Sequence, residues 1–248
     1  IAALYGGTSP NIYPSNLMAT NLNPIAYYPL GEQAQNTGKL PQATANVWQF
    51  PNGVLQDYVM DFDGVNDYIV GTESVVTGNS PRTISCWIKT STQHIGNLFS
   101  LGEWSAVSSF ASRFAVSTRG QYGKEIRIYT NTPTIILTYN TNIDLYNDSW
   151  YNIVVTYDGT NTYKLYINGN PEDTQTDNTT LITESGFSIG SWYNNAPTQF
   201  FNGQMSNVVV WNSDQSANIA NIYNNGSPQT TYTVTPQNWW KLNADSVY

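Results

Sequence analysis

Tight-turn signals divide this chain into short segments, and they constrain its fold more than any other feature. Asn and Asp followed by Gly supply the positive φ angles that hairpin turns need. Such pairs recur between runs rich in β-branched and aromatic residues, among them Asp63-Gly64, Asp158-Gly159, Asn168-Gly169, Asn202-Gly203 and Asn225-Gly226. The sequence therefore predicts many short antiparallel strands, and 248 residues can form such a fold as one domain.

The clearest hairpin is WYNIVVTYDGTNTYKLYING, between Trp150 and Gly169. Ile153 and Val155 alternate along its first strand, and Tyr163, Leu165 and Ile167 alternate along its second. Side chains two residues apart on a strand share a face. We therefore expect Val155 and Leu165 to lie on the core face.

One segment has helical periodicity. Ile219, Ile222 and Tyr223 are spaced i, i+3 and i+4, with Ser216 as the expected cap and Gly226 as the stop. The sequence predicts one short helix near the C-terminus and strands elsewhere.

The composition argues against several partners. The net charge is -8, the isoelectric point is near 4.4, and only 10% of the residues are charged, so a nucleic-acid backbone would be repelled. No apolar run approaches the ~18 residues of a membrane span, so we expect no direct membrane insertion. The single cysteine, Cys86, lies in the strand-like TISCWIK and reads as a small buried hydrophobe.

Two short segments recur in the same order. Ile1 to Pro10 matches Ile219 to Pro228, and Asn23 to Leu30 resembles Thr235 to Leu242. Two blocks at nearly equal spacing make chance similarity a poor explanation. We therefore expect a window of a tandem array, with a closing segment of a preceding repeat and linker at 1–22, one domain at 23–228, and a linker with the opening strand of a following repeat at 229–248.

Several motifs together resemble the laminin G-like jelly-roll domains of the concanavalin A-like type. These are, in order, VMDFDGVNDYIVG (Val59 to Gly71), RTISCWIKT (Arg82 to Thr90), LFSLG (Leu98 to Gly102), the central hairpin, FSIGSW (Phe187 to Trp192) and FFNGQMSNVVVWN (Phe200 to Asn212). The resemblance implies an all-β, two-sheet antiparallel sandwich with one short C-terminal helix, and members that mostly bind carbohydrate or protein. Similar Asn-, Thr- and Tyr-rich repeats occur in phage and extracellular structural proteins.

Three oxygen donors cluster at one predicted hairpin tip, Asp63, Asn66 and Asp67. Ca²⁺ takes six to eight oxygen ligands, and the resembled family often binds Ca²⁺ at a rim of the sandwich. The alternative is that these side chains serve only the turn backbone. Many relatives carry an acidic pair where this chain has Ser206 and Asn207, which lowers the charge available to a metal.

Catalytic patterns are missing from the sequence. Glycoside hydrolases of this fold carry an ExDxxE strand whose carboxylates share one groove, and this chain has no such pattern. His94 is the only histidine, and it lies in the loop-like STQHIGN without acidic neighbours, as expected of a solvated loop residue. We expect no enzyme activity.

Binding therefore remains, in two forms. The segment GSWYNNAPTQFF is expected to be a loop that presents Trp192, Tyr193, Asn194 and Asn195 to a glycan, and Trp104 is a second candidate. Such a module would serve adhesion in an extracellular, cell-surface or virion-surface protein. The alternative is a purely structural repeat of a fibre, capsid decoration or surface assembly, in which these aromatics pack against the core, neighbouring repeats or copies of the same protein.

Overall fold

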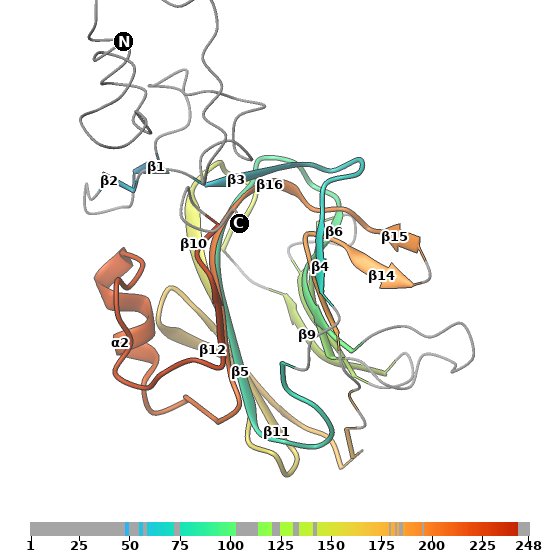
Figure 1. The fold of residues 1–248 in the computed structure, drawn as a ribbon, viewed down its shortest axis with the longest axis vertical. Coiled ribbons are helices and arrows are strands. Elements are labelled where there is room, and N and C mark those ends of the chain that lie inside the picture. Colours follow the sequence, from blue (N-terminus) through green and yellow to red (C-terminus); the bar gives the residue numbers. More distant parts are fainter. Residues whose placement is uncertain are drawn as a thin grey trace, which may run out of the picture.

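Two antiparallel sheets face each other in this protein and form a β-sandwich (Figure 1). The computed structural model describes residues 48–49, 55–56, 59–71, 75–102, 114–120, 125–130, 134–140, 143–178, 180–181, 183, 186–194 and 196–242. The expected all-β fold is confirmed. Residues 1–47, which include the first members of both repeated pairs, lie outside the described residues.

The larger sheet has seven strands in the order β12-β11-β10-β5-β16-β17, with β3 also paired to β16. The strands are β3 (Met60–Asp63), β5 (Arg82–Lys89), β10 (Trp150–Tyr157), β11 (Thr162–Ile167), β12 (Asn170–Thr176), β16 (Asn202–Trp211) and β17 (Asn238–Trp240).

The smaller sheet has six strands in the order β4-β13-β6-β7-β8-β9. The strands are β4 (Ile69–Gly71), β6 (Ile95–Leu101), β7 (Phe114–Arg119), β8 (Glu125–Thr130), β9 (Thr134–Asn140) and β13 (Phe187–Ile189). Two isolated pairs accompany the sandwich, β1 (Trp48–Gln49) with β2 (Leu55–Gln56) and β14 (Trp192–Asn194) with β15 (Ala196–Thr198).

The core lies between the two sheets, and the central hairpin contributes to it as predicted. Val155 pairs with Leu165 across β10 and β11, and both side chains are buried in the main apolar cluster. Cys86 belongs to the same cluster, and burial raises the pKa of its thiol to about 12. The expected register and the buried cysteine are both confirmed.

The outer face of the larger sheet is buried as well. α2 (Ile219–Tyr223) continues into a 3-10 turn, η2 (Asn224–Gly226), and covers this face, where Ile219 and Ile222 pack with Val154 and Val209 (Figure 1). Every residue of β10 is therefore buried, although alternation alone predicted one core face. In the described part of the chain, no helix has the length and apolar character to cross a bilayer.

The prediction of Ser216 as the N-cap of this helix is wrong. The N-cap residue is Asn218, which makes no side-chain capping bond. Ser216 instead donates from its backbone N–H to Asp214 Oδ1 (2.8 Å) and from its hydroxyl to Asp214 Oδ2 (3.1 Å). Asp214 thus organises a separate turn, and the helix begins after it.

The last strand, β17, belongs to the larger sheet of this sandwich. It pairs antiparallel with β16, with Trp240 opposite Val208 and Asn238 opposite Val210. Trp240 packs against the core and Leu242 is buried in it. This strand completes the sandwich, while the predicted domain bounds and the tandem array stay predictions.

Truncation of Leu165 tests the core register. Leu165→Ala removes a fully buried side chain and is expected to cost about 2–5 kcal/mol of unfolding free energy. Lys164→Ala, at the neighbouring half-buried position on the opposite face, should cost much less. Chemical denaturation of both variants measures the difference, and equal losses would contradict the register.

The Asp158 turn predicts a pH dependence. Burial raises the pKa of the Asp158 carboxyl, but Oδ1 accepts the N–H groups of Thr160, Asn161 and Thr162 at 2.8, 2.9 and 3.0 Å, and these bonds together lower the pKa overall. The stabilisation is therefore complete above the ordinary value of about 3.9 and is lost as the pH falls through the lower folded pKa.

We expect Asp158→Asn to reduce stability at pH 7, because an amide oxygen is a weaker acceptor than a carboxylate. The two proteins should approach equal stability in strong acid, below the lowered folded pKa, where the native side chain is neutral too. Urea unfolding at both pH values measures this, and a difference that persists at low pH would contradict the charge as its cause.

Candidate functional site

One end of the sandwich carries a structured surface, here called the tip, which comprises the turn at 63–68, His94 and residues 200–202. The carboxylate of Asp63 organises the turn, since its Oδ1 accepts the N–H groups of Val65 (2.7 Å) and Asn66 (3.1 Å). These bonds lower the pKa of the Asp63 carboxyl. Asp67 Oδ2 accepts the Asp63 N–H at 2.9 Å. Both carboxylates therefore stabilise the turn backbone, which is the structural role that the sequence offers as the alternative to metal binding.

Asn202 ties this turn to β16. Its side-chain amide donates to the Asp63 carbonyl at 2.8 Å, and its backbone pairs with Asp63. Gly64 has a φ of 77°, and a Cβ there would lie 2.7 Å from the Asn202 Cβ. Only glycine allows this close approach, so the Asp63-Gly64 signal reports both a turn and a contact.

His94 is not the solvated loop residue that the sequence suggests. It is half-buried, and its Nε2 lies 2.8 Å from the Asn202 backbone nitrogen and 3.0 Å from the Phe200 carbonyl oxygen. Its Nδ1 lies 3.0 Å from the Thr92 carbonyl. Both ring nitrogens therefore contact the backbone, and the ring braces the junction between β6 and β16.

The tip exposes apolar and aromatic surface. Val65 and Tyr68 are 67% and 40% exposed, and Val70, which follows the tip on β4, is 45% exposed. These are three of the four exposed large hydrophobic residues in the described part of the chain. The Tyr68 and Phe200 rings lie 6.2 Å apart. The exposed Asn66 and half-buried Asn202 place neutral amides in the same surface.

The segment expected to be a binding loop is instead a short β-hairpin, formed by β14 and β15, on the same side of the molecule as the turn after β3 (Figure 1). The Trp192 side chain is only 7% exposed, and its ring packs edge-on against Tyr129 with centroids 5.1 Å apart. The Arg119 guanidinium carbon lies 5.3 Å from the Tyr129 ring centroid. Trp192 therefore anchors the hairpin to the smaller sheet and does not offer an open indole face.

A buried polar network supports the start of this hairpin. Asn97 is fully buried, and its amide donates to the Ser191 carbonyl (2.6 Å) and the Ser100 hydroxyl (2.9 Å), while its oxygen accepts from Ser117 (2.9 Å). The Asn97 N–H also donates to the Gln199 carbonyl at 2.9 Å. The hairpin thus leaves and re-enters the sandwich at fixed points.

The other expected site residues are described only in part or not at all. Tyr193 and Asn194 belong to β14 by their backbone. Their side chains, together with Asn195 and Trp104, lie outside the described residues. Tyr68 and Phe200, the aromatic pair of the tip, were not predicted as site residues, because only the oxygen donors of the turn motif suggested a site. Both residues lie in the motifs that resemble the family.

The metal-binding candidates offer few free oxygens. Asp63 Oδ1 and Asp67 Oδ2 are bonded to the backbone, which leaves Asp63 Oδ2, Asp67 Oδ1 and the Asn66 amide as the oxygens that a cation would use. Within the described residues, no three His, Cys, Asp or Glu side chains gather as metal ligands would. Ser206 and Asn207 are occupied elsewhere, because the Ser206 hydroxyl donates to Lys241 and the Asn207 amide donates to Ser206.

The fold and motifs match a known family. The model of the concanavalin A-like lectin/glucanases superfamily matches residues 63–218, which is more than half of the chain. The chain belongs to this superfamily. A comparison with curated proteins found no match.

Several solved members of this fold are similar in structure. A candidate carbohydrate binding protein from Bacteroides ovatus superposes with a TM-score of 0.56 at 17% identity, over 75% of this chain and 51% of that one. The heptameric SAP-like pentraxin from Limulus polyphemus gives 0.53 at 14% identity, over 71% and 89%. Domain 4 of the extracellular arabinanase AbnA from Geobacillus stearothermophilus, in complex with arabinotriose, gives 0.52 at 15% identity, over 71% and 80%. The chain spans about half the length of the Bacteroides protein.

Calcium at the tip stays a prediction that thermal melting can test. An ion bound only by the native tip would raise the melting temperature in excess Ca²⁺ above that in EDTA. We expect Asp67→Asn, which removes one charge but keeps the side-chain shape, to abolish that difference. Identical melting of the parent protein in Ca²⁺ and in EDTA would leave the turn as the only role of these carboxylates.

Proposed function

We propose that this chain is a non-catalytic carbohydrate-binding and adhesion module, with the tip as its binding surface. The observation that carries the proposal is the exposed ring of Tyr68, which lies against Phe200 beside two neutral amides. A sugar ring is recognised by stacking of its C–H face on an aromatic ring and by hydrogen bonds to its hydroxyls. The tip combines both kinds of contact.

The rigidity of the tip supports the same proposal. Asn202 bonds at once to the Asp63 carbonyl and to His94, and β3 pairs with β16 up to Asn202. A binding surface that is already ordered loses little conformational entropy when a ligand binds. A low density of charge also suits a neutral ligand, because few ionic groups must be desolvated.

The electrostatics of the tip do not suit glycoside hydrolysis. A general acid needs a raised pKa, whereas the pKa of the Asp63 carboxyl is lowered by backbone N–H groups. Both ring nitrogens of His94 are engaged in structural contacts with the backbone. The described groups of the tip therefore favour binding over proton transfer.

The structural relatives fit this proposal. One is described as a candidate carbohydrate binding protein, and another is a domain of an extracellular enzyme whose structure contains arabinotriose. We propose an extracellular, cell-surface or virion-surface location on the same grounds. The glycan itself is left to experiment.

A glycan array with matched variants tests the proposal. We expect Tyr68→Ala to weaken binding about tenfold or more, since stacking on one aromatic ring contributes on the order of 1–3 kcal/mol. Tyr68→Phe keeps the ring and should retain most of the affinity. Val234→Ala, at a residue 39% exposed that lies outside the tip, serves as the control for surface truncation.

Absence of any saturable glycan signal in the parent protein would refute the function. Binding that survives Tyr68→Ala but is lost in Tyr193→Ala, with the melting temperature unchanged, would move the site to the β14–β15 hairpin. Trp192→Ala is a poor probe, because the buried indole anchors that hairpin and its loss lowers stability.

A second candidate function is a structural repeat that assembles with copies of itself and binds no glycan. It is favoured by the position of β17, whose sequence has a counterpart near the N-terminus. A parent protein that self-associates and gives no array signal would support this candidate.

A further inference from the structure

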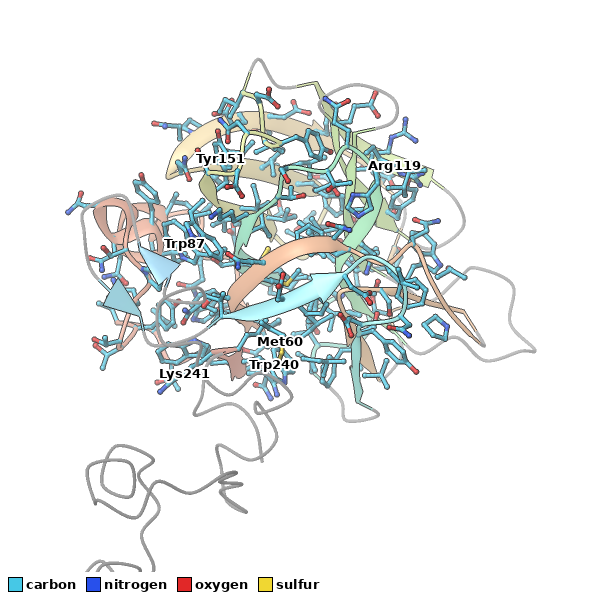
Figure 2. The ribbon with its side chains drawn as sticks, turned by 90° about the horizontal axis from the view of Figure 1, so that it is seen from above. Met60, Trp87, Arg119, Tyr151, Trp240 and Lys241 are labelled. Carbon is cyan, nitrogen blue, oxygen red and sulfur yellow. The ribbon has the colours of Figure 1, made fainter. Side chains whose placement is uncertain are left out.

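The outer edge of β16 is shared by two strands that are far apart in the sequence. β3 pairs with its first half, where Met205 faces Met60, and β17 pairs with its second half, where Val208 faces Trp240. The change of partner occurs at a β-bulge between Ser206 and Val209. We call the second half of this edge the β17 slot. Met60 and Trp240 are labelled at this edge in Figure 2.

The inner face of β17 completes the core. The Trp240 ring centroid lies 4.4 Å from that of Phe187 and 5.8 Å from that of Phe99, both on the opposite sheet. Leu242, two residues later, is 2% exposed and belongs to the main cluster. Without an occupant, the slot would open the core to solvent and leave the edge of β16 unpaired.

The outer face of β17 is held by a bulge residue and an aromatic contact. Asn207 has a φ of 48°, and its N–H donates to the Lys241 carbonyl at 2.9 Å. The Asn207 side-chain oxygen accepts the indole N–H of Trp239 at 2.9 Å. The Trp239 ring packs edge-on against Tyr232, with centroids 4.9 Å apart.

The chain contains a second segment with the same pattern. Residues 23–30, NPIAYYPL, align with residues 235–242, TPQNWWKL, without a gap. The alignment puts an aromatic or apolar residue at each anchor of β17: Tyr27 at Trp239, Tyr28 at Trp240 and Leu30 at Leu242. Pro29 stands at Lys241, whose carbonyl takes part in pairing, and proline keeps that carbonyl. The sequences of two segments therefore suit the same slot.

We propose that the β17 slot is a strand-exchange site, at which β17 of one copy fills the slot of the next copy, and residues 23–30 fill the slot of the copy that receives no β17. The partner is a second copy of this chain, because its slot offers the contacts that β17 makes here. The inference rests on the second candidate function and is independent of glycan binding.

The physical basis is that an exchanged strand keeps its contacts while its connection changes. A released β17 would expose two indole rings and unpaired backbone groups, both of which favour addition to an open sheet edge. Residues 227–237 precede β17 and can extend to about 36 Å, enough to reach a neighbouring copy. Because donor and slot lie at different places on each copy, the contact is head-to-tail and propagates into a filament unless it closes into a ring.

Disulfide trapping tests exchange between copies of the full chain. Val210 faces Asn238 in the register, so a Val210→Cys copy mixed with an Asn238→Cys copy can form a disulfide only when β17 of one enters the slot of the other. We expect cross-linked dimers that increase with protein concentration, and none from either variant alone. Cys86 will not compete, since it is buried and its thiol pKa is raised to about 12.

A chain that carries both cysteines is the control for geometry. Closure of its own disulfide, together with no dimer from the mixed single variants, would overturn the proposal, because β17 would then stay within its own chain. A glycan signal does not bear on this outcome, and failure of glycan binding does not affect it.

A thermal-melting cycle provides the second measurement. If residues 23–30 can replace β17, then Trp240→Ala alone and Tyr28→Ala alone each lower the melting temperature slightly, and the double variant lowers it by more than the sum. A large loss in Trp240→Ala that Tyr28→Ala leaves unchanged would mean that only β17 fits the slot, and the proposal would fail.

Discussion

Burial of the larger sheet on both faces is the constraint on which the rest of this structure depends. Val154 and Val209 point away from the sandwich core, yet both are fully buried beneath α2 and the segment that leads to β17. A sheet covered on one side only needs alternating polar residues, whereas β10 is buried at every position. The short helix is therefore part of the core, and the C-terminal segment must return to the sheet to complete the cover.

Both candidate functions depend on β16, because this strand positions both the tip and the β17 slot. One edge of this strand pairs with β5. Its other edge pairs first with β3 and then with β17. The bulge at Asn207 separates the two halves, because a residue at positive φ breaks the ladder and turns its N–H toward Lys241. Asn202 at one end of the strand holds the tip, and Val208 to Val210 near the other end form the β17 slot.

Much of the fold could be predicted because period-two alternation and Asx-Gly turns are local signals. The register of Val155 with Leu165 followed from them directly. The position of Trp192 did not, since its burial depends on Tyr129, 63 residues away in sequence and on another strand. Ser216 was mistaken for a cap because Asp214 forms a competing turn. The position of β17 could not be predicted, because it depends on which edge of β16 is left unpaired in the tertiary structure.

The geometry allows adhesion and assembly to coexist. The tip is bounded by Asn202, and the β17 slot begins at Val208, so strand exchange at the slot does not require any residue of the tip to change its contacts. A head-to-tail chain of copies joined through β17 would present one tip for each copy. Repetition would then raise the effective concentration of weak binding sites, which is how modest affinity for a sugar becomes firm adhesion to a glycan-covered surface.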